Sequence, residues 1–288
     1  MEKQNKLNLV IPYNKTILGK VKETKLIMNV TAFEFDSCCS YFIESQKLIP
    51  DFIMDYCQSP LCFIGFNERW IGKNILVIAW EIGSIKLLLE SADLIKKINP
   101  TIFLMASNKK SYAELRILAS LGIRCGIYFN RDIVYWEEFK DLIYYNFERK
   151  INSAPIEPFN YLSKQYRHAN EVDPGTCFYD NPLYYLFVDH NENIAASLYD
   201  LKHNSFICNG IDNFFNFYFE SYVSKINSQK EEFFSTINDC SSCPAWRICT
   251  GRFSIQKKKM ETCSKSFSYL LDKLESAKTQ FLTKECLQ

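Results

Sequence analysis

A short stretch near the end of the chain, from Asp239 to Cys263, carries the side chains best suited to chemistry. This cysteine segment reads DCSSCPAWRICTGRFSIQKKKMETC, and its thiols follow the spacing C-x2-C-x5-C-x13-C at Cys240, Cys243, Cys249 and Cys263. A C-x-x-C pair puts two thiolates on one tight turn, where both can bind one metal ion or one face of a cluster. The other two would complete a four-sulfur shell, which suits tetrahedral zinc or a 4Fe–4S cluster equally well. The spacing therefore predicts one metal centre.

The amino-acid composition limits which binding partners and which cellular compartment we expect for this protein. The 288 residues carry a net charge of +1, so nothing favours nucleic acid or an anionic membrane as a partner. Several of the 12 cysteines, such as Cys62 in LCFIGF and Cys125 in IRCGIYF, stand in apolar runs where buried, inert thiols are the rule. The N-terminal MEKQNKLNLVIPYN lacks the uninterrupted apolar core of a signal peptide. We therefore expect a protein of the reducing cytoplasm.

The first half of the chain predicts the elements of an α/β fold. Apolar runs bounded by turn residues indicate strands, and apolar residues at helical spacing indicate helices. Strand–helix alternation with short connections predicts a parallel sheet in a partial, barrel-like (βα)n domain, whose strand ends would hold an active site. The expected strands are 7–12, 25–31, 61–66, 74–80, 101–107 and 123–130, and the expected helices are 41–57 (whole or broken at Pro50), 84–97, 111–122 and 132–147.

The second half has a different pattern. The proline-bearing stretch INSAPIEPFN interrupts the alternation, which predicts a boundary between a domain of residues 1–160 and a smaller one of residues 161–288. Beyond the boundary we expect, in order, a hairpin over 184–197, an aromatic helix over 211–223, the cysteine segment, and a final helix over 266–280.

The order of these C-terminal features resembles the SPASM extension of radical SAM peptide maturases. Cys177 corresponds to the family's first cysteine, and the hairpin VDHNENIAAS is similar to its strand–turn–strand of the form IDxxGxIxxC. In that comparison Glu192 stands at the glycine position, while Ser197 and Phe253 stand at cysteine positions. The resemblance implies that one of the family's two auxiliary 4Fe–4S sites has lost two ligands. It also implies that the other site keeps all four, in the cysteine segment, and it favours a 4Fe–4S cluster there. Zn2+ stays the alternative occupant, because a closed four-thiolate site suits it as well.

The N-terminal half resembles the same family with its catalytic motif lost. A radical SAM enzyme carries C-x3-C-x2-C after a strand, and here the three positions fall on Glu34, Cys38 and Tyr41. The family's glycine-rich loop for the methionine moiety corresponds to the degenerate GFNE of Gly65–Glu68. The resemblance therefore implies no S-adenosylmethionine cluster and no catalytic residues, as in a pseudo-radical SAM protein.

Three functional hypotheses remain open. The favoured one is a non-catalytic pseudo-radical SAM/SPASM protein that binds a precursor peptide or an active radical SAM maturase in a ribosomal peptide modification system. The second is an electron-relay iron–sulfur protein that uses the one surviving cluster. The third is an unrelated α/β protein whose cysteine segment is a structural zinc site.

Overall fold

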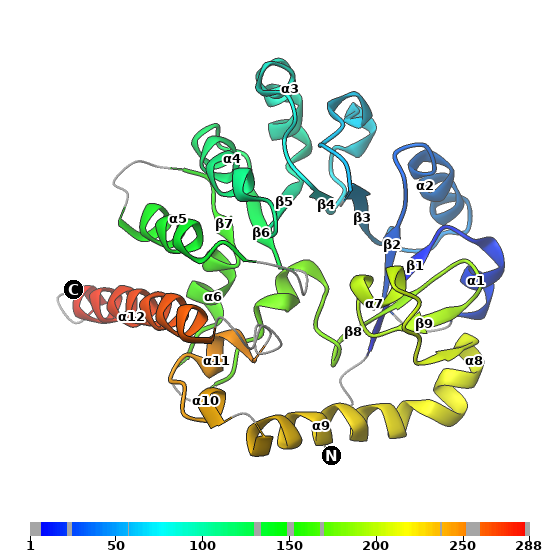
Figure 1. The fold of residues 1–288 in the computed structure, drawn as a ribbon. Helices are drawn as coiled ribbons and strands as arrows, with labels where there is room; N and C mark the ends of the chain where they lie inside the picture. Colours follow the sequence, from blue (N-terminus) through cyan, green and yellow to red (C-terminus); the bar gives the residue numbers. More distant parts are fainter. Residues whose placement is uncertain are drawn as a thin grey trace.

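The centre of the molecule is one curved sheet. The computed structural model describes residues 7–21, 25–56, 58–129, 134–148, 153–167, 170–236, 238–251 and 260–285. Within these residues, ten strands form a mostly parallel sheet in the order β10-β9-β8-β1-β2-β3-β4-β5-β6-β7. The sheet bends into an open arc, and helices cover its outer side (Figure 1). The predicted α/β class with a parallel sheet is thus confirmed.

In the parallel part of the sheet, strands that follow one another in the sequence also lie next to one another. Each strand from β1 to β7 pairs with the next one in the sequence. The strands are β1 (Asn8–Pro12), β2 (Leu26–Asn29), β3 (Asp51–Tyr56), β4 (Ile75–Ala79), β5 (Thr101–Met105), β6 (Cys125–Tyr128) and β7 (Ile156–Glu157). The outer helices are α1 (Lys15–Lys20), α2 (Phe35–Glu44), α3 (Ile85–Ile98), α4 (Lys109–Ser120) and α5 (Trp136–Glu148).

Local chemistry explains why these elements form where they do. All five residues of β4, ILVIA, are buried, as expected for a strand covered on both faces of a parallel sheet. Helix α3 begins where the Ser84 side chain accepts a hydrogen bond from Leu87 N–H, and it ends at Asn99, whose left-handed backbone closes the last turn. The predicted helix over 84–97 is therefore confirmed.

The predicted helix over 41–57 is wrong. The chain instead forms α2, which begins six residues before the predicted start and ends 13 residues before the predicted end, and then enters β3. Helix α2 stops because Gln46 takes a left-handed φ of 53°, and Pro50 directly before β3 cannot continue a helix. The apolar run DFIMDY then pairs with β2 on one side and β4 on the other.

The predicted strand LCFIGF, residues 61–66, is also wrong. It forms a short 3-10 turn, η1 (Phe63–Gly65), followed by a second one, η2 (Glu68–Trp70). Since β3 already pairs with β2 and β4, no free edge is left at this place for another strand. The apolar residues Leu61, Phe63 and Phe66 are buried in the core from these turns. A short apolar run cannot by itself distinguish the two outcomes.

Strands from the second half of the chain extend the same sheet. β8 (Tyr185–Val188) pairs in parallel with β1, and β9 (Asn193–Ala195) and β10 (Cys208–Asn209) follow as antiparallel strands. The predicted hairpin over 184–197 is confirmed. The predicted boundary at residue 160 stays a prediction, with the sheet running across it through β1 and β8.

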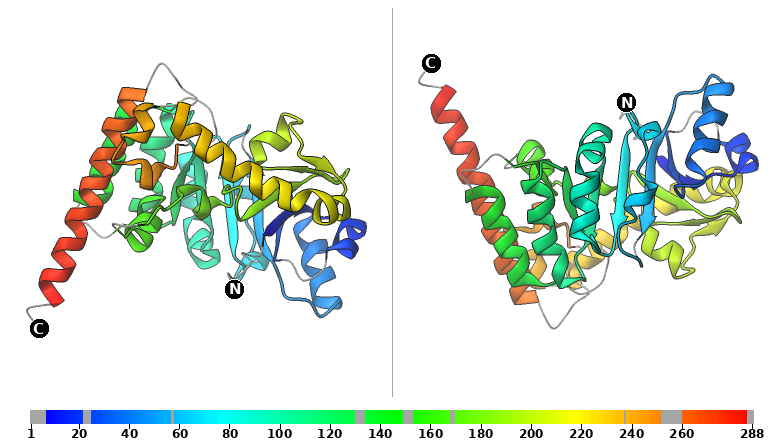
Figure 2. Two further views of the ribbon diagram at one scale, coloured as in Figure 1. Left: turned by 90° about the horizontal axis from the view of Figure 1, so that it is seen from below. Right: turned by 90° about the horizontal axis from the view of Figure 1, so that it is seen from above.

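The remaining elements close the open side of the arc and lead to the cysteine segment. Helix α9 crosses below the arc, from the hairpin side toward the cysteine segment, and α12 lies against α5 (Figures 1 and 2). No helix in the described ranges is long and apolar enough to cross a membrane. These elements are α6 (Phe159–Gln165), η3 (Pro174–Phe178), α7 (Leu198–Lys202), α8 (Ile211–Asn213), η4 (Phe214–Tyr218), α9 (Phe219–Thr236), α10 (Asn238–Ser241), α11 (Trp246–Cys249) and α12 (Met260–Glu285).

Two predicted helices are found with different lengths. The aromatic helix expected over 211–223 continues to Thr236 and contains a π-helical turn, η4. The final helix expected over 266–280 runs from Met260 to Glu285. The predicted start of the 132–147 helix lies outside the described residues.

An aromatic cluster fastens the C-terminal helix to the sheet domain. Phe267 of α12 is 1% exposed, and its ring centroid lies 5.4 Å from that of Phe139 and 6.1 Å from that of Trp136. Phe139 in turn lies 5.7 Å from Phe159 of α6. Rings at these separations add to the stabilisation from burial itself. Helix α12, whose first turn carries the last cysteine of the predicted site, is therefore anchored on α5.

A half-buried carboxyl group on α4 makes the stability of the sheet domain depend on pH. Glu114 accepts a hydrogen bond from Ile82 N–H at 2.8 Å. Burial raises its pKa above the ordinary 4.5, and the neighbouring Glu81 raises it further, although the Ile82 bond and Lys110 act against the rise. Because the folded-state pKa is raised, the contribution of Glu114 to stability is fully present below the ordinary pKa and is lost as pH rises through the folded value.

We expect Glu114→Gln to raise the free energy of unfolding at pH 7 while leaving it unchanged near pH 4, because the amide oxygen keeps the bond to Ile82 without the charge. Urea unfolding of both proteins between pH 4 and pH 8 measures the difference. Equal stability of the two at every pH would contradict this role for Glu114.

Candidate metal centre

Three of the four predicted cysteines lie on one compact turn–helix–turn. Cys240 belongs to α10, and Cys243 N–H donates to its carbonyl oxygen at 3.2 Å, which is the tight turn that C-x-x-C predicts. Helix α11 follows and ends at Cys249, whose N–H donates to Ala245 O at 3.2 Å. The chain then reverses through Thr250 with a φ of 50° and a glycine with a φ of 74°.

Contacts from a distant part of the sequence hold this turn in place. Ala245 and Ile248 are fully buried on its inner side. Val172 N–H donates to Arg247 O at 2.7 Å, and Trp246 Nε1 donates to Glu171 Oε1 at 3.3 Å. Reasoning from the sequence missed Glu171 and Val172, since neither residue forms part of a motif with the cysteines. Only the folded chain brings them together.

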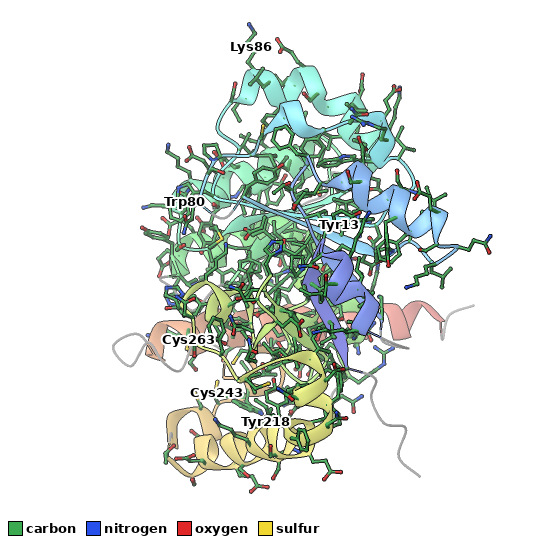
Figure 3. The ribbon with its side chains drawn as sticks, turned by 90° about the vertical axis from the view of Figure 1, so that its right-hand side faces the viewer. Tyr13, Trp80, Lys86, Tyr218, Cys243 and Cys263 are labelled. Atoms are coloured by element: carbon green, nitrogen blue, oxygen red, sulfur yellow. The ribbon has the colours of Figure 1, made fainter. Side chains whose placement is uncertain are left out.

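The fourth cysteine reaches the turn from α12. Cys263 lies in the first part of that helix, and the adjacent Ser264 Oγ lies 3.6 Å from Cys243 Sγ. Figure 3 shows Cys243 and Cys263 in the same region of the molecule. The structure therefore places the last cysteine beside the turn although 13 residues separate it from Cys249.

The four thiols lie within electrostatic reach of one another. Burial raises the pKa of the Cys249 thiol to about 12, with further increases from Cys243, Cys263 and Cys240. Burial also raises the pKa of Cys263 to about 11, with Cys240 and Cys243 adding to the rise. As four soft sulfur donors, these side chains suit the ions that favour thiolates, zinc and iron–sulfur clusters.

The sulfurs are nevertheless not arranged as a closed ligand shell. Within the part of the chain that the structure describes, no group of three or more histidine, cysteine, aspartate or glutamate side chains could hold a metal ion as placed. The four sulfur donors nevertheless fit zinc or an iron–sulfur cluster in their chemistry.

The other positions of the SPASM resemblance have structural roles. Cys177 is half-buried in η3, and its Sγ donates to Pro174 O at 2.9 Å. Ser197 caps α7, because its Oγ accepts a hydrogen bond from Asp200 N–H at 3.0 Å and donates to Asp200 Oδ2 at 2.7 Å. Phe253 lies outside the described residues. Ser197 thus supplies a helix cap where the family has a thiolate.

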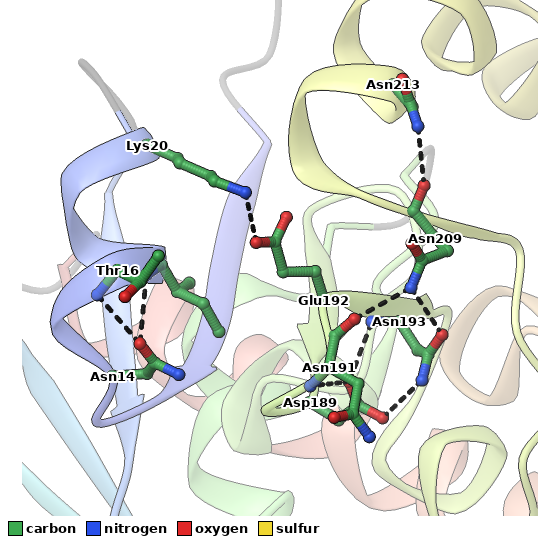
Figure 4. A network of polar contacts seen from close by, with 10 residues as sticks. Asn14, Thr16, Lys20, Asp189, Asn191, Glu192, Asn193, Asn209 and Asn213 are labelled. Atoms are coloured by element: carbon green, nitrogen blue, oxygen red, sulfur yellow. Dashed lines mark hydrogen bonds and ion pairs between the residues drawn. The ribbon is translucent and has the colours of Figure 1, made fainter.

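In the hairpin turn, Glu192 adopts a backbone conformation that is typical of glycine. Glu192 has a φ of 62°, in the left-handed region where glycine is favoured. Its carboxylate forms an ion pair with Lys20 of α1 (Figure 4). The turn is also fixed by Asp189 Oδ1, which accepts hydrogen bonds from the N–H groups of Asn191 and Asn193 at 2.8 Å each. The glycine position of the resemblance therefore coincides with a turn that requires a positive φ.

We expect Glu192→Gly to leave the free energy of unfolding unchanged or to raise it by up to about 1 kcal/mol, because relief of the left-handed strain offsets the loss of a partly exposed ion pair. Urea unfolding measures the change, with Lys20→Met as the control that loses the ion pair alone. A decrease of more than about 1 kcal/mol in the glycine variant would show that Glu192 is a structural requirement of the turn.

The three positions that the resemblance assigns to a catalytic cysteine motif carry side chains with structural contacts. The Glu34 carboxylate accepts hydrogen bonds from Thr31 N–H and Thr31 Oγ1, both at 2.9 Å, and closes the turn before α2. Cys38 is fully buried, and burial raises the pKa of its thiol to about 12. Tyr41 packs edge-on against Tyr13, with 6.3 Å between ring centroids.

The loop GFNE, residues 65–68, is explained by packing. A Cβ added to Gly65 would lie 3.3 Å from Ala32 Cβ and 3.4 Å from the Tyr56 hydroxyl, so the close approach of this turn to β3 and to the loop after β2 favours glycine. Asn67 begins η2, and its side chain accepts a hydrogen bond from Arg69 N–H.

Comparison of the chain with protein-family models and with curated proteins finds no match.

Proposed function

We propose that this chain is a non-catalytic relative of the radical SAM/SPASM peptide maturases, in which Cys240, Cys243, Cys249 and Cys263 hold one metal centre in a small SPASM-like C-terminal domain. The observation that carries the proposal is the gathering of these four thiols from α10, α11 and α12 and from the turn between α10 and α11. The partial (βα)n arc in front of them supports the same comparison, because parallel strands with outer helices are what a radical SAM domain would supply.

The metal centre is proposed as one 4Fe–4S cluster, with Zn2+ as the alternative. Four protein thiolates leave no open coordination position, so a centre here would stabilise the fold or relay electrons without binding substrate. The chain's own contribution is to release the thiol protons and bring the sulfurs together. Since burial raises the pKa of Cys249 and Cys263, metal affinity should increase with pH.

The absence of catalysis is proposed from the three substituted motif positions. Glu34 is engaged with Thr31, Cys38 is buried as a thiol, and Tyr41 packs on Tyr13, so none is available to ligate a catalytic cluster. Incubation of the anaerobically reconstituted, dithionite-reduced protein with S-adenosylmethionine should give no 5′-deoxyadenosine above the blank. Formation of 5′-deoxyadenosine would overturn the non-catalytic assignment.

The proposed partners are a precursor peptide, an intact radical SAM maturase, or both, in the cytoplasm. A net charge of +1 gives no reason to propose nucleic acid or membrane. Calorimetry with the precursor peptide and the maturase encoded beside this chain should give micromolar or tighter binding to one of them, about −8 kcal/mol. Absence of binding to both, in calorimetry and in pull-down, would reject this function.

A further inference from the structure

An exposed face of the helix that closes the arc carries an aromatic ring between two carboxylates. Phe217 is 75% exposed, and the adjacent Tyr218 is 45% exposed. Asp212 and Glu220 are also exposed, and they are the only charged residues between 211 and 224. In the described part of the chain, neither carboxylate takes part in an ion pair or a side-chain hydrogen bond. The face is therefore acidic, apolar and open to solvent.

The π-helical turn aligns these groups. Residues 214–218 form η4, in which residues five apart stand on successive turns. Asp212 lies in α8 (Ile211–Asn213), directly before η4, and the wider turn of η4 makes the angle between Asp212 and Phe217 smaller than the value of about 140° in a regular α-helix. Glu220 follows Phe217 by three residues, a spacing at which helix side chains are neighbours. The unusual turn thus sets one carboxylate before the ring and one after it.

The inner side of the same helix is fixed to the body of the protein. Phe214 is fully buried, and its ring centroid lies 5.7 Å from that of the buried Tyr222. The Tyr222 hydroxyl donates to Pro182 O at 2.9 Å. With its opposite side anchored in this way, the face that bears Phe217 is held outward, and Figure 3 labels Tyr218 on this helix in the lower part of the molecule.

We propose that this face, defined by Asp212, Phe217, Tyr218 and Glu220, binds a lysine- or arginine-bearing segment of a peptide. A cation is attracted to the face of an exposed aromatic ring, and the effect grows when the contact excludes water. The two carboxylates complement the same charge and would orient it over Phe217. The inference rests on the proposed function, since it names the chemistry by which a peptide or maturase partner would be held.

Fluorescence anisotropy measures the binding of a fluorescein-labelled synthetic peptide, in which lysine alternates with leucine, to the full-length protein. The wild type should bind this peptide, and replacing its lysines with glutamates should abolish binding. Phe217→Ser should weaken binding about fivefold, and the double variant Asp212→Asn, Glu220→Gln by a similar factor at low salt. The matched control is Phe33→Ser, which removes a 96% exposed phenylalanine elsewhere on the surface and should change nothing.

Equal binding by the wild type and Phe217→Ser, or no binding of the lysine peptide by the wild type, would overturn the proposal. Concentration-dependent dimerisation that Phe217→Ser abolishes would also overturn it, by assigning the face to a second copy of this chain. If the precursor peptide or the maturase binds the wild type and Phe217→Ser equally, this inference fails while the proposed function stands. If neither binds but the lysine peptide does so through Phe217, the proposed function fails and the inference stands.

Discussion

Replacing Phe267 with alanine should lower the free energy of unfolding by about 3–5 kcal/mol, the usual cost of removing a buried phenylalanine from a packed core. Phe267 is 1% exposed and packs against Trp136 and Phe139 of α5. It lies four residues after Cys263, so it anchors the helix turn that presents the last cysteine. The variant should therefore also lose metal, because α12 would no longer hold that thiol beside Cys243.

Chemical unfolding followed by circular dichroism measures the stability change, and metal analysis of the purified variant measures the second effect. Phe33→Ala is the matched control, since its ring is 96% exposed and its loss should cost less than about 0.5 kcal/mol. A loss of under about 1 kcal/mol for Phe267→Ala would show that the aromatic cluster does not anchor α12.

Cys243→Ser should abolish metal binding and destabilise the C-terminal half of the protein. A hydroxyl group does not replace a thiolate as a ligand for zinc or iron–sulfur clusters, and a bound metal contributes its binding free energy to folding. Within the turn, Cys243 is hydrogen-bonded through its backbone to Cys240, and a serine would keep that bond. The expected loss of metal and of stability thus comes from the missing sulfur. Metal analysis measures the first loss, and thermal unfolding with and without a chelator measures the second.

Cys177→Ser is the control for that experiment. Cys177 is half-buried, like Cys243, but its thiol donates to Pro174 O, and the resemblance assigns it to the site that has lost two ligands. Its replacement should leave metal content unchanged. If Cys177→Ser removed the metal as completely as Cys243→Ser, the assignment of ligands to one lost and one surviving site would be wrong.

The sequence predicts the repeating part of the fold well, because its apolar runs and helix caps act locally. β4 and α3 are examples, where a fully apolar run and a Ser84 cap specify strand and helix without help from distant residues. The segment from 41 to 66 fails for the opposite reason. There the choice between helix, strand and turn depends on which sheet edge is free, and that is decided by pairing of β3 with β2 and β4.

The local turn of the candidate site is predictable from the sequence, whereas the contacts that support the turn are not. Spacing alone indicates that Cys240 and Cys243 share a turn, and the structure has that turn. The contacts of Glu171 and Val172 with the segment, and the anchoring of α12 through Phe267, join residues far apart in the sequence. No local sequence pattern predicts these contacts. Glu192 is the converse case, where the resemblance marks a glycine position and the backbone takes the glycine conformation with another residue.

Metal analysis of the anaerobically purified full-length protein tests the central claim most directly. The account predicts one centre per chain, either about four iron and four sulfide per protein or about one zinc, with the content lost in Cys243→Ser and kept in Cys177→Ser. About eight iron atoms per chain, or no bound metal in wild-type protein after reconstitution with iron, sulfide or zinc, would contradict it.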